Sequence, residues 1–308
     1  MKIGLVGYKI KEIKELEKKY SKVQLINIDH KNFFKKKNHD LTALIILYEY
    51  PLKNKLNLFI KRKFNLFTKL KWVHFSRAGL NNCIPYINSY KFKLTSGKKI
   101  QAPNVSEHCL AMLLFISRNL LSNKNNEIGP IELFGKKILI TGFGGIGSMI
   151  GKKLNSFGCE IYSSTLVSKS PKFSKKNFKL NKIKKVLNKF DIIINCLPFT
   201  KKTKNFFNKN IFKKMKQNSI FVNMSRDETF VLKDLKVFLK NKKILGAGID
   251  STNIKKTTYI KKLNLLITNH QGGKSDNYLR RKKLIEKNLI FFLKRKKLLN
   301  LFSKTKQY

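Results

Sequence analysis

The chain has 308 residues, of which 42% are hydrophobic, so its size and composition suit a globular protein of two domains or one large one. Its longest clean apolar run, Leu41 to Tyr48, is too short to cross a bilayer, and we expect no membrane insertion. The formal net charge is +50, but most of the cations are lysines spread along the whole chain, so no specific nucleic-acid site is expected.

The N-terminal segment and the cysteines indicate the compartment. The chain starts with a strand-like run and a turn, without the long apolar region and cleavage site of a signal peptide. Its cysteines form no CxxC pair, and its histidines have no metal-ligand spacing. We therefore expect a cytoplasmic protein with reduced thiols and no metal site.

Strand-like and helix-like segments alternate over the first hundred residues. Apolar residues at helical spacing predict a helix over 9–20. Short apolar runs predict strands at 3–6, 23–28, 44–47, 72–75 and 92–95. Such alternation is typical of a parallel sheet that is covered by helices on both faces.

A long helical pattern, 104–121, opens a second series of elements. One broad apolar face is formed by Val105, Cys109, Met112, Leu113, Ile116 and Leu120. After a polar loop at 122–130, strands are predicted at 137–141, 159–162, 191–197, 219–224, 244–250 and 265–269. Further helices are predicted at 148–157, 205–217 and 232–240, and the basic tail, 277–299, is also helical in pattern.

A glycine motif lies between the strand at 137–141 and the following helix. Gly142, Gly144 and Gly147 have the spacing GxGxxG. In a dinucleotide site the first glycine makes a tight turn, the second lets the backbone approach the pyrophosphate, and the third lets helix and strand pack closely. The flanking strand and helix favour dinucleotide binding, although a glycine turn that only packs a helix against a strand would have the same spacing.

Five ordered segments together resemble the D-isomer-specific 2-hydroxyacid dehydrogenases over almost the whole chain. They are 104–118, 133–158, 191–203, 221–226 and 268–270. The resemblance implies a two-domain α/β fold in which a Rossmann domain, 101–270, interrupts a flavodoxin-like domain. That second domain would consist of residues 1–100 plus 271–308 and would bind the substrate. It also implies a homodimer that uses the 104–121 helix and its neighbouring surface.

The resemblance assigns roles to single residues. Arg226 would hold the substrate carboxylate and polarise the ketone, and His270 would be the acid and base. Both follow a predicted strand end, where ligands sit in open α/β sheets. Arg77, Ala78 and Gly79 would form the substrate loop together with Arg226. The cofactor would contact Gly142, Gly144, Gly145, Ile146, Gly147, Thr165, Leu197, Pro198, Thr203, Met224 and Asp250.

The expected catalytic glutamate is missing. The family places one a few residues after the aspartate that matches Asp250, where it pairs with the histidine. Here the matching position is about Lys255, and no acidic residue occurs between Ser251 and Ser275. A lysine near His270 would disfavour the charged imidazole and move the pH optimum of the reductase to the acid side.

The residue that selects NAD is also missing. NAD-binding Rossmann domains carry an acidic residue about 20 residues beyond the glycines, which binds the ribose 2′-hydroxyl. Thr165 stands there, and Ser168 and Lys169 follow it. The sequence favours NADP(H) over NAD(H), although Lys169 could be one more solvated lysine.

We therefore expect an NAD(P)-dependent oxidoreductase that acts on a small 2-oxo or 2-hydroxy acid such as glyoxylate or hydroxypyruvate. The missing glutamate motivates an alternative, a catalytically weak dinucleotide-binding protein that acts as a sensor or binds a partner. A third hypothesis, an electrostatic nucleic-acid binder, predicts steep salt dependence of binding and no effect of changes at Gly144.

Overall fold

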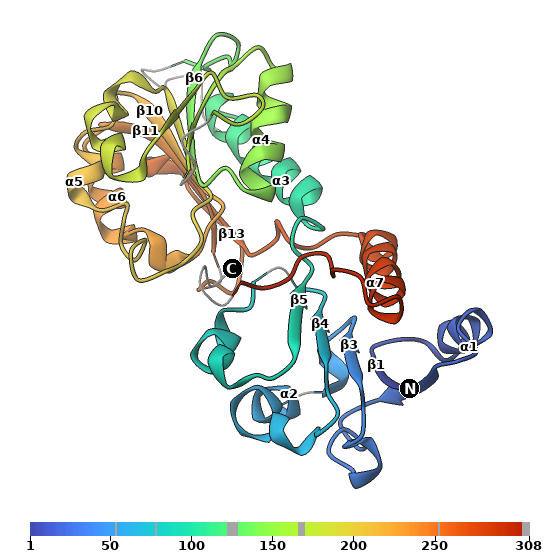
Figure 1. Ribbon diagram of the computed structural model, residues 1–308. Coiled ribbons are helices and arrows are strands. Elements are labelled where there is room, and N and C mark those ends of the chain that lie inside the picture. Colours follow the sequence, from blue (N-terminus) through green and yellow to red (C-terminus); the bar gives the residue numbers. More distant parts are fainter. Residues whose placement is uncertain (53, 78, 122–128, 166–169, 252, 304–308) are drawn as a thin grey trace. The chain divides into compact units, whose positions relative to one another are not determined.

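The structure, a computed structural model, describes residues 1–52, 54–77, 79–121, 129–165, 170–251 and 253–303 (Figure 1). The chain divides into two compact units. Unit 1 comprises Met1–Ile100 and Asp276–Tyr308, and unit 2 comprises Gln101–Ser275, so the second unit is inserted into the first. The predicted fold class, two α/β units of which one interrupts the other, is confirmed.

Unit 1 is built on a five-stranded parallel sheet in the order β2-β1-β3-β4-β5. The strands are β1 Lys2–Val6, β2 Gln24–Ile28, β3 Ala43–Ile46, β4 Trp72–Phe75 and β5 Lys93–Ser96. Its helices are α1 Ile10–Lys19, α2 Lys55–Leu58 and α7 Tyr278–Leu293, with a π-helical turn at Phe59–Lys63 and a 3-10 helix at Asn81–Ser89. The predicted strands of this part are confirmed, and β3 and β4, in the interior of the sheet, are buried on both faces.

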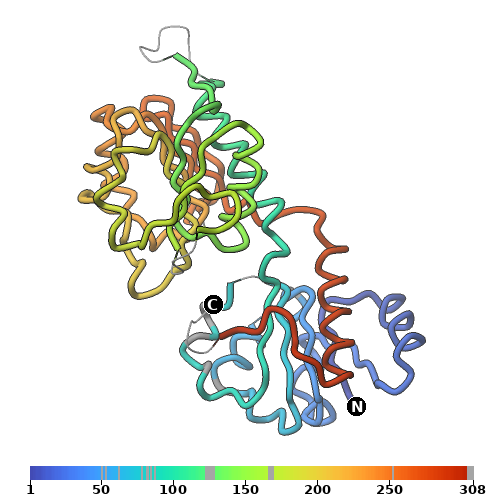
Figure 2. Tube along the Cα trace, turned by 45° about the horizontal axis from the view of Figure 1, so that its top comes forward, coloured from blue at the N-terminus to red at the C-terminus, as the bar shows by residue number. Residues whose placement is uncertain are grey.

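The C-terminal tail completes the core of unit 1, as the return of the red chain to the blue chain shows in Figures 1 and 2. Ile285 and Leu289 of α7 are buried with residues of β1, β3 and α1 in one hydrophobic cluster. The ring of Phe292 lies 5.1 Å from that of Trp72 on β4. The tail is therefore part of this unit. Its helix ends at Leu293 rather than at the predicted residue 299, and Arg295 then takes a left-handed φ of 54°.

A buried histidine on β4 makes the stability of unit 1 sensitive to acid. His74 is fully buried, with Nδ1 2.8 Å from Thr95 Oγ1, and burial lowers the pKa of His74 to about 3. In the unfolded chain the ordinary histidine pKa of about 6.5 applies, so below that pH the unfolded state takes up a proton that the folded state does not bind. We expect stability to fall by about 1.4 kcal/mol per pH unit from this group between pH 6.5 and about 3.

Urea denaturation followed through Trp72, the sole tryptophan of the chain, measures this effect. His74→Gln should remove the acid-dependent slope that this group contributes. His39→Gln is the control, because His39 is only partly buried and should keep the wild-type slope. Equal acid sensitivity of the wild type and His74→Gln would contradict the assignment.

Unit 2 is a doubly wound sheet in the order β12-β13-β11-β10-β9-β6-β7-β8. The strands are β6 Lys137–Thr141, β7 Glu160–Ser164, β8 Lys176–Phe178, β9 Ile192–Asn195, β10 Ser219–Asn223, β11 Ile244–Ser251, β12 Thr258–Ile260 and β13 Leu265–Asn269. All neighbours pair in parallel except β12 and β13. Since β6 and β9 are central neighbours whose crossovers run in opposite directions, the glycine turn after β6 lies at the topological switch point.

Helices cover both faces of this sheet (Figure 1). α3 Ala102–Ser117 and α4 Gly145–Ser156 pack on one face, with Leu113, Ile116 and Ile150 fully buried. α5 Lys209–Phe212 and α6 Leu232–Lys240 pack on the other, over Phe221 and Ile249. Alternate residues along the strands therefore pack into two separate hydrophobic clusters, one on each face of the sheet.

The structure corrects several predicted boundaries in unit 2. The helix predicted to reach Leu121 ends at Ser117, because Asn119 takes a left-handed φ of 50°, and Leu120 is 63% exposed. The helix predicted over 205–217 is reduced to α5, because Phe207 is held extended in a bridge to Phe230. The three-residue strands β8 and β12 were not predicted, since such short segments carry little periodicity.

Candidate active site

The glycine turn after β6 has the geometry that its spacing predicts. Gly142 has φ +83°, and a Cβ atom there would lie 2.4 Å from the carbonyl oxygen of Cys196. A Cβ atom on Gly147 would lie 2.3 Å from the carbonyl oxygen of Gly142. Both positions therefore require glycine within the protein itself, because the backbone passes too close for any side chain.

Gly144 differs from these two glycines. It is the N-cap of α4 with an ordinary φ of −80°, and a Cβ atom there would meet nothing within 4 Å. No side chain caps the helix, and Gly145 and Ile146 lie half-buried in its first turn. Unpaired amides at a helix N-terminus beside open space form an anion site, and this cradle fits a dinucleotide pyrophosphate.

The loop after β9 lies against the glycine turn. Leu197 N, which would be 2.8 Å from a Cβ on Gly142, donates to Asn195 Oδ1 at 3.1 Å. Thr203 Oγ1 donates to Pro198 O at 2.6 Å and accepts a hydrogen bond from Thr200 N at 2.8 Å. Leu197 thus lies beside the glycine turn, whereas the Thr203 hydroxyl forms its hydrogen bonds within its own loop.

The loop after β7 is the place expected for the ribose. Gly142 N donates to Ser164 O at 2.9 Å, so the end of β7 adjoins the glycine turn. Thr165 follows directly and is half-buried. The hydroxyl of Ser164 is buried and has no hydrogen-bond partner among the described residues. Ser168 and Lys169 lie outside the described residues.

Arg226 follows β10, and a buried polar network fixes its backbone. Asn195 Nδ2 donates to Asn223 Oδ1 and to Thr229 Oγ1, both at 2.8 Å. Thr229 Oγ1 in turn donates to Arg226 O at 2.7 Å. Ser225 Oγ donates to Leu197 O and ties this loop to the one after β9. The Arg226 side chain is half-buried, and among the described residues it forms no ion pair.

His270 follows β13 and stands beside Asp250, the penultimate residue of β11. The backbone of His270 is left-handed, with φ 44°, a conformation that costs a non-glycine residue about 1 kcal/mol or more. Asp250 holds the turn, because its carboxylate accepts from Gln271 N at 2.8 Å and from Gly272 N at 3.1 Å. The second oxygen, Oδ2, lies 3.9 Å from His270 Nδ1.

The other side of Asp250 faces α3. Thr268 Oγ1 donates to Asp250 Oδ1 at 2.7 Å, and His108 Nε2 lies 2.9 Å from the same hydroxyl. Burial lowers the pKa of His108, and the Asp250 carboxylate, 3.7 Å away, opposes that shift. Sequence reasoning gave His108 no role. Its position three residues after Val105 and four before Met112, within the apolar face of α3, is the signal that could have found it.

Lys255, which the resemblance places at about the position of the family glutamate, contacts Asn269, the neighbour of His270, through its backbone. Its carbonyl oxygen accepts from Asn269 Nδ2 at 2.6 Å, and its side chain is exposed. The expectation that its ammonium group acts on His270 stays a prediction. Asp227 accepts a hydrogen bond from Ser251 Oγ at 3.0 Å, and Met224, at the end of β10, packs toward Gly272.

The predicted substrate loop of unit 1 carries an ion pair. Arg77 Nε lies 3.0 Å from Glu49 Oε1, and the guanidinium stands 5.3 Å from the Phe75 ring centroid. Burial raises the pKa of Glu49, and the neighbouring Arg77 partly offsets that rise. A carboxylate at the end of β3 therefore already engages this arginine. Ala78 lies outside the described residues, and Gly79 is half-buried.

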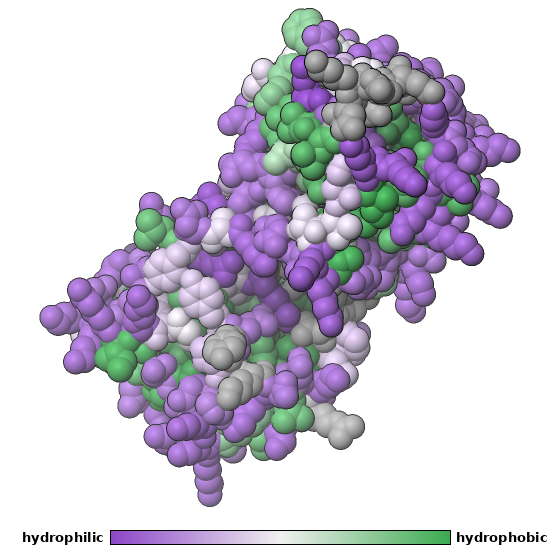
Figure 3. Space-filling model, turned by 180° about the vertical axis from the view of Figure 1, so that it is seen from behind, coloured by the Kyte–Doolittle hydropathy of each residue, from purple (hydrophilic) through white to green (hydrophobic). Residues whose placement is uncertain are grey.

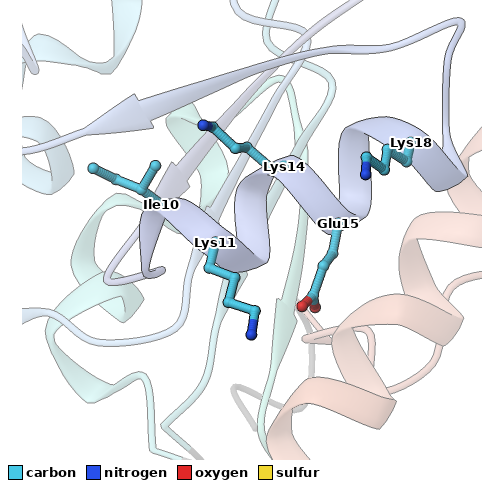
Figure 4. A pocket seen from close by; sticks show the side chains of 5 residues that line it. All are labelled: Ile10, Lys11, Lys14, Glu15 and Lys18. Carbon is cyan, nitrogen blue, oxygen red and sulfur yellow. The ribbon is translucent and has the colours of Figure 1, made fainter.

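The remaining surface offers little defined chemistry. The face in Figure 3 is covered largely by hydrophilic side chains. A shallow hollow along α1 is lined by Ile10, Lys11, Lys14, Glu15 and Lys18, and Figure 4 shows Lys14 leaving the helix on a different side from Lys11. Within the described ranges no cluster of metal-ligating side chains occurs, the four cysteines are free, and no helix is long and apolar enough to span a membrane.

Comparison with known proteins decides the family. Residues 113–272 match the model of the D-isomer specific 2-hydroxyacid dehydrogenase, NAD binding domain, which is more than half of the chain. The chain belongs to this family. The matched segment runs from within α3 to just beyond His270 and contains the glycine turn, Arg226 and Asp250. The predicted family resemblance is therefore confirmed.

Individual proteins of this kind also match the chain. The chain is 34% identical over 119 residues to a glyoxylate reductase from Pyrococcus furiosus, an alignment that covers 39% of this chain and 35% of the relative. Its structure is similar to a D-isomer specific 2-hydroxyacid dehydrogenase family protein from Aeromonas salmonicida, with a TM-score of 0.78, 21% identity and coverage of 98% and 99%. A glyoxylate/hydroxypyruvate reductase from Sinorhizobium meliloti gives a TM-score of 0.77 at 17% identity, with coverage of 100% and 99%.

The sequence alignment and the structural similarities support different conclusions. The alignment with the Pyrococcus relative spans about a third of that protein's length. At 17–21% identity the two solved structures establish a shared fold over the whole chain, not a shared reaction.

Proposed function

We propose that this member of the family is an NAD(P)-dependent reductase of small 2-oxo acids such as glyoxylate or hydroxypyruvate. One observation carries the proposal: Arg226 and the Asp250–His270 pair lie at the carboxyl edge of the same parallel sheet as the glycine turn. Strand carboxyl ends are where open α/β sheets bind ligands, and these groups are those that reduction of a 2-oxo acid requires.

Each residue has a defined task in the proposed reaction. The Arg226 guanidinium binds the substrate carboxylate and polarises the adjacent ketone through its fixed set of donors. Protonated His270 gives its proton to the ketone oxygen, and the Asp250 carboxylate lies 3.9 Å from Nδ1 of its ring. The nicotinamide, when bound, supplies the hydride for the carbonyl carbon. The product is the 2-hydroxy acid, and the reverse reaction needs neutral His270.

We further propose a preference for NADP(H), which the absence of an acidic residue at Thr165 supports. An acid there would repel the 2′-phosphate of NADP, and a threonine does not. The hydroxyl of Ser164, buried at the end of β7, adds a polar atom close to this position. In the same proposal the enzyme is a cytoplasmic homodimer and Arg77 takes part in substrate binding.

The test has two stages. NADPH and NADH are first titrated against the purified full chain by nicotinamide fluorescence, and then a panel of 2-oxo acids is screened for oxidation of the preferred cofactor. We expect tighter NADPH binding and turnover on at least one small 2-oxo acid. Tight cofactor binding without turnover on any substrate would overturn the proposal in favour of a dinucleotide-binding sensor.

A further inference from the structure

Asp250 is shared between two histidines. Its Oδ2 lies 3.9 Å from His270 Nδ1, and its Oδ1 lies 3.7 Å from His108 Nε2. Among the described residues, these two are the basic side chains that come within 4.0 Å of the carboxylate. Arg226 after β10 and Lys255 after β11 form no ion pair with Asp250 in the part of the chain that the structure describes.

The hydrogen bonds that link Asp250, Thr268 and His108 determine where the protons lie. An ionised carboxylate only accepts, so the single hydroxyl proton of Thr268 is directed to Asp250 Oδ1, its shortest contact at 2.7 Å. The Thr268 oxygen then acts as the acceptor for His108 Nε2 at 2.9 Å. His108 must therefore carry a proton on Nε2, and it is neutral at pH 7 because burial lowers its pKa.

Close packing restricts the positions of the Asp250 and His108 side chains. A Cβ on Gly272 would lie 2.9 Å from Asp250 Oδ2 and 3.3 Å from the His108 ring. Glycine at this position therefore lets both side chains pack directly against the backbone of the turn. Asn104 Nδ2, also on α3, donates to Gly272 O at 2.7 Å. Asp250 is 6% exposed, so its charge acts on the groups around it with little screening by water.

We propose that His108, acting through Thr268, orients Asp250 as the carboxylate partner of His270, and that this arrangement replaces the glutamate that the chain lacks. Both His108 and Asp250 are positioning residues. A neutral His108 leaves the negative charge of Asp250 available to His270, whereas a protonated His108 would compete for it. The inference rests on the proposed reductase function for its kinetic consequences, but the proton positions are testable without turnover.

The first experiment records ¹⁵N spectra of the full chain with labelled histidine. The sequence has five histidines, so His108→Gln assigns the signal of His108 by its loss. We expect His108 to be neutral at pH 7 with its proton on Nε2, and Thr268→Val to abolish that preference. A wild-type signal protonated on Nδ1 alone would overturn the proposal, whether or not the enzyme turns over a substrate.

The second experiment follows the pH dependence of 2-oxo acid reduction together with that of the His270 ring signals. Loss of the Asp250 charge should move the falling limb of the rate to lower pH by about one unit in Asp250→Asn, and the His270 ring signals should change with it. His108→Leu should move the falling limb in the same direction by about half a unit. His108→Gln should keep the wild-type pH profile, because the glutamine amide nitrogen can donate a hydrogen bond to Thr268.

A double-mutant cycle separates positioning from general destabilisation. In the Asp250→Asn background, His108→Leu should cause no further shift, because the group through which it acts is already neutral. Glu107→Gln, an exposed neighbour on α3 that pairs with Lys153, is the control and should keep the wild-type profile. An equal His108→Leu shift in both backgrounds, or failure of His108→Gln to rescue, would refute the role of His108. If no 2-oxo acid is reduced, the proposed function fails while the His108 and His270 spectra still decide this inference.

Discussion

Arg226→Ala is expected to lower kcat/KM for reduction of the preferred 2-oxo acid by about 10²–10³-fold. The guanidinium contributes in the transition state as well as in binding, because the ketone oxygen gains negative charge as it is reduced. The Arg226 backbone is held by Thr229 and its side chain forms no described ion pair, so truncation removes a ligand contact without breaking an internal one. Steady-state kinetics at saturating cofactor measure the loss.

Two variants sharpen this prediction. Arg226→Lys keeps the charge but not the fork of donors, so it should recover only part of the activity. Arg118→Ala removes an exposed arginine at the end of α3 and should leave kcat/KM unchanged. NADPH affinity should also stay at its wild-type value in Arg226→Ala. Activity of Arg226→Ala close to that of Arg118→Ala would remove Arg226 from the site.

Most of the fold was predictable because its central strands are short, apolar and buried. The run Ile192 to Ile194, for example, is buried on both faces, as only a central parallel strand can be. Prediction was wrong where tertiary contacts override local pattern. Phe207 lies in a segment with helical spacing, yet it pairs with Phe230 as an isolated bridge.

The candidate site was predictable in its local parts and not in its long-range contacts. Gly142, Arg226 and His270 each follow a predicted strand, so their place at one sheet edge follows from topology alone. The contact between His108 and Asp250 joins residues far apart in sequence, across a helix-to-sheet interface that no spacing rule encodes. No acidic residue occurs between Ser251 and Ser275 in the sequence, whereas in the structure the Asp250 carboxylate itself lies 3.9 Å from His270 Nδ1.

Gly142→Ala should damage the fold of unit 2. The left-handed backbone costs an alanine about 1–2 kcal/mol, and its Cβ would overlap the backbone of Cys196 and Leu197 at 2.4–2.8 Å. We expect a total destabilisation of about 3 kcal/mol or more, visible as a lower thermal unfolding temperature without cofactor. An unchanged unfolding temperature would mean that the turn can relax at little cost.

Gly144→Ala should leave the free protein intact and still abolish cofactor binding. Its φ of −80° suits alanine, and no atom of the described residues lies within 4 Å of the new Cβ, so the unfolding temperature without cofactor should match the wild type. The methyl group would occupy the open space before the first turn of α4 and keep a pyrophosphate from its amides. Losing two charge-assisted hydrogen bonds, at about 1.5 kcal/mol or more each, corresponds to a loss in NADPH affinity of about 100-fold or more. Fluorescence titration and thermal unfolding of the two glycine variants therefore distinguish a residue that the protein requires from one that only its ligand requires. Wild-type affinity of Gly144→Ala would show that the turn serves packing alone.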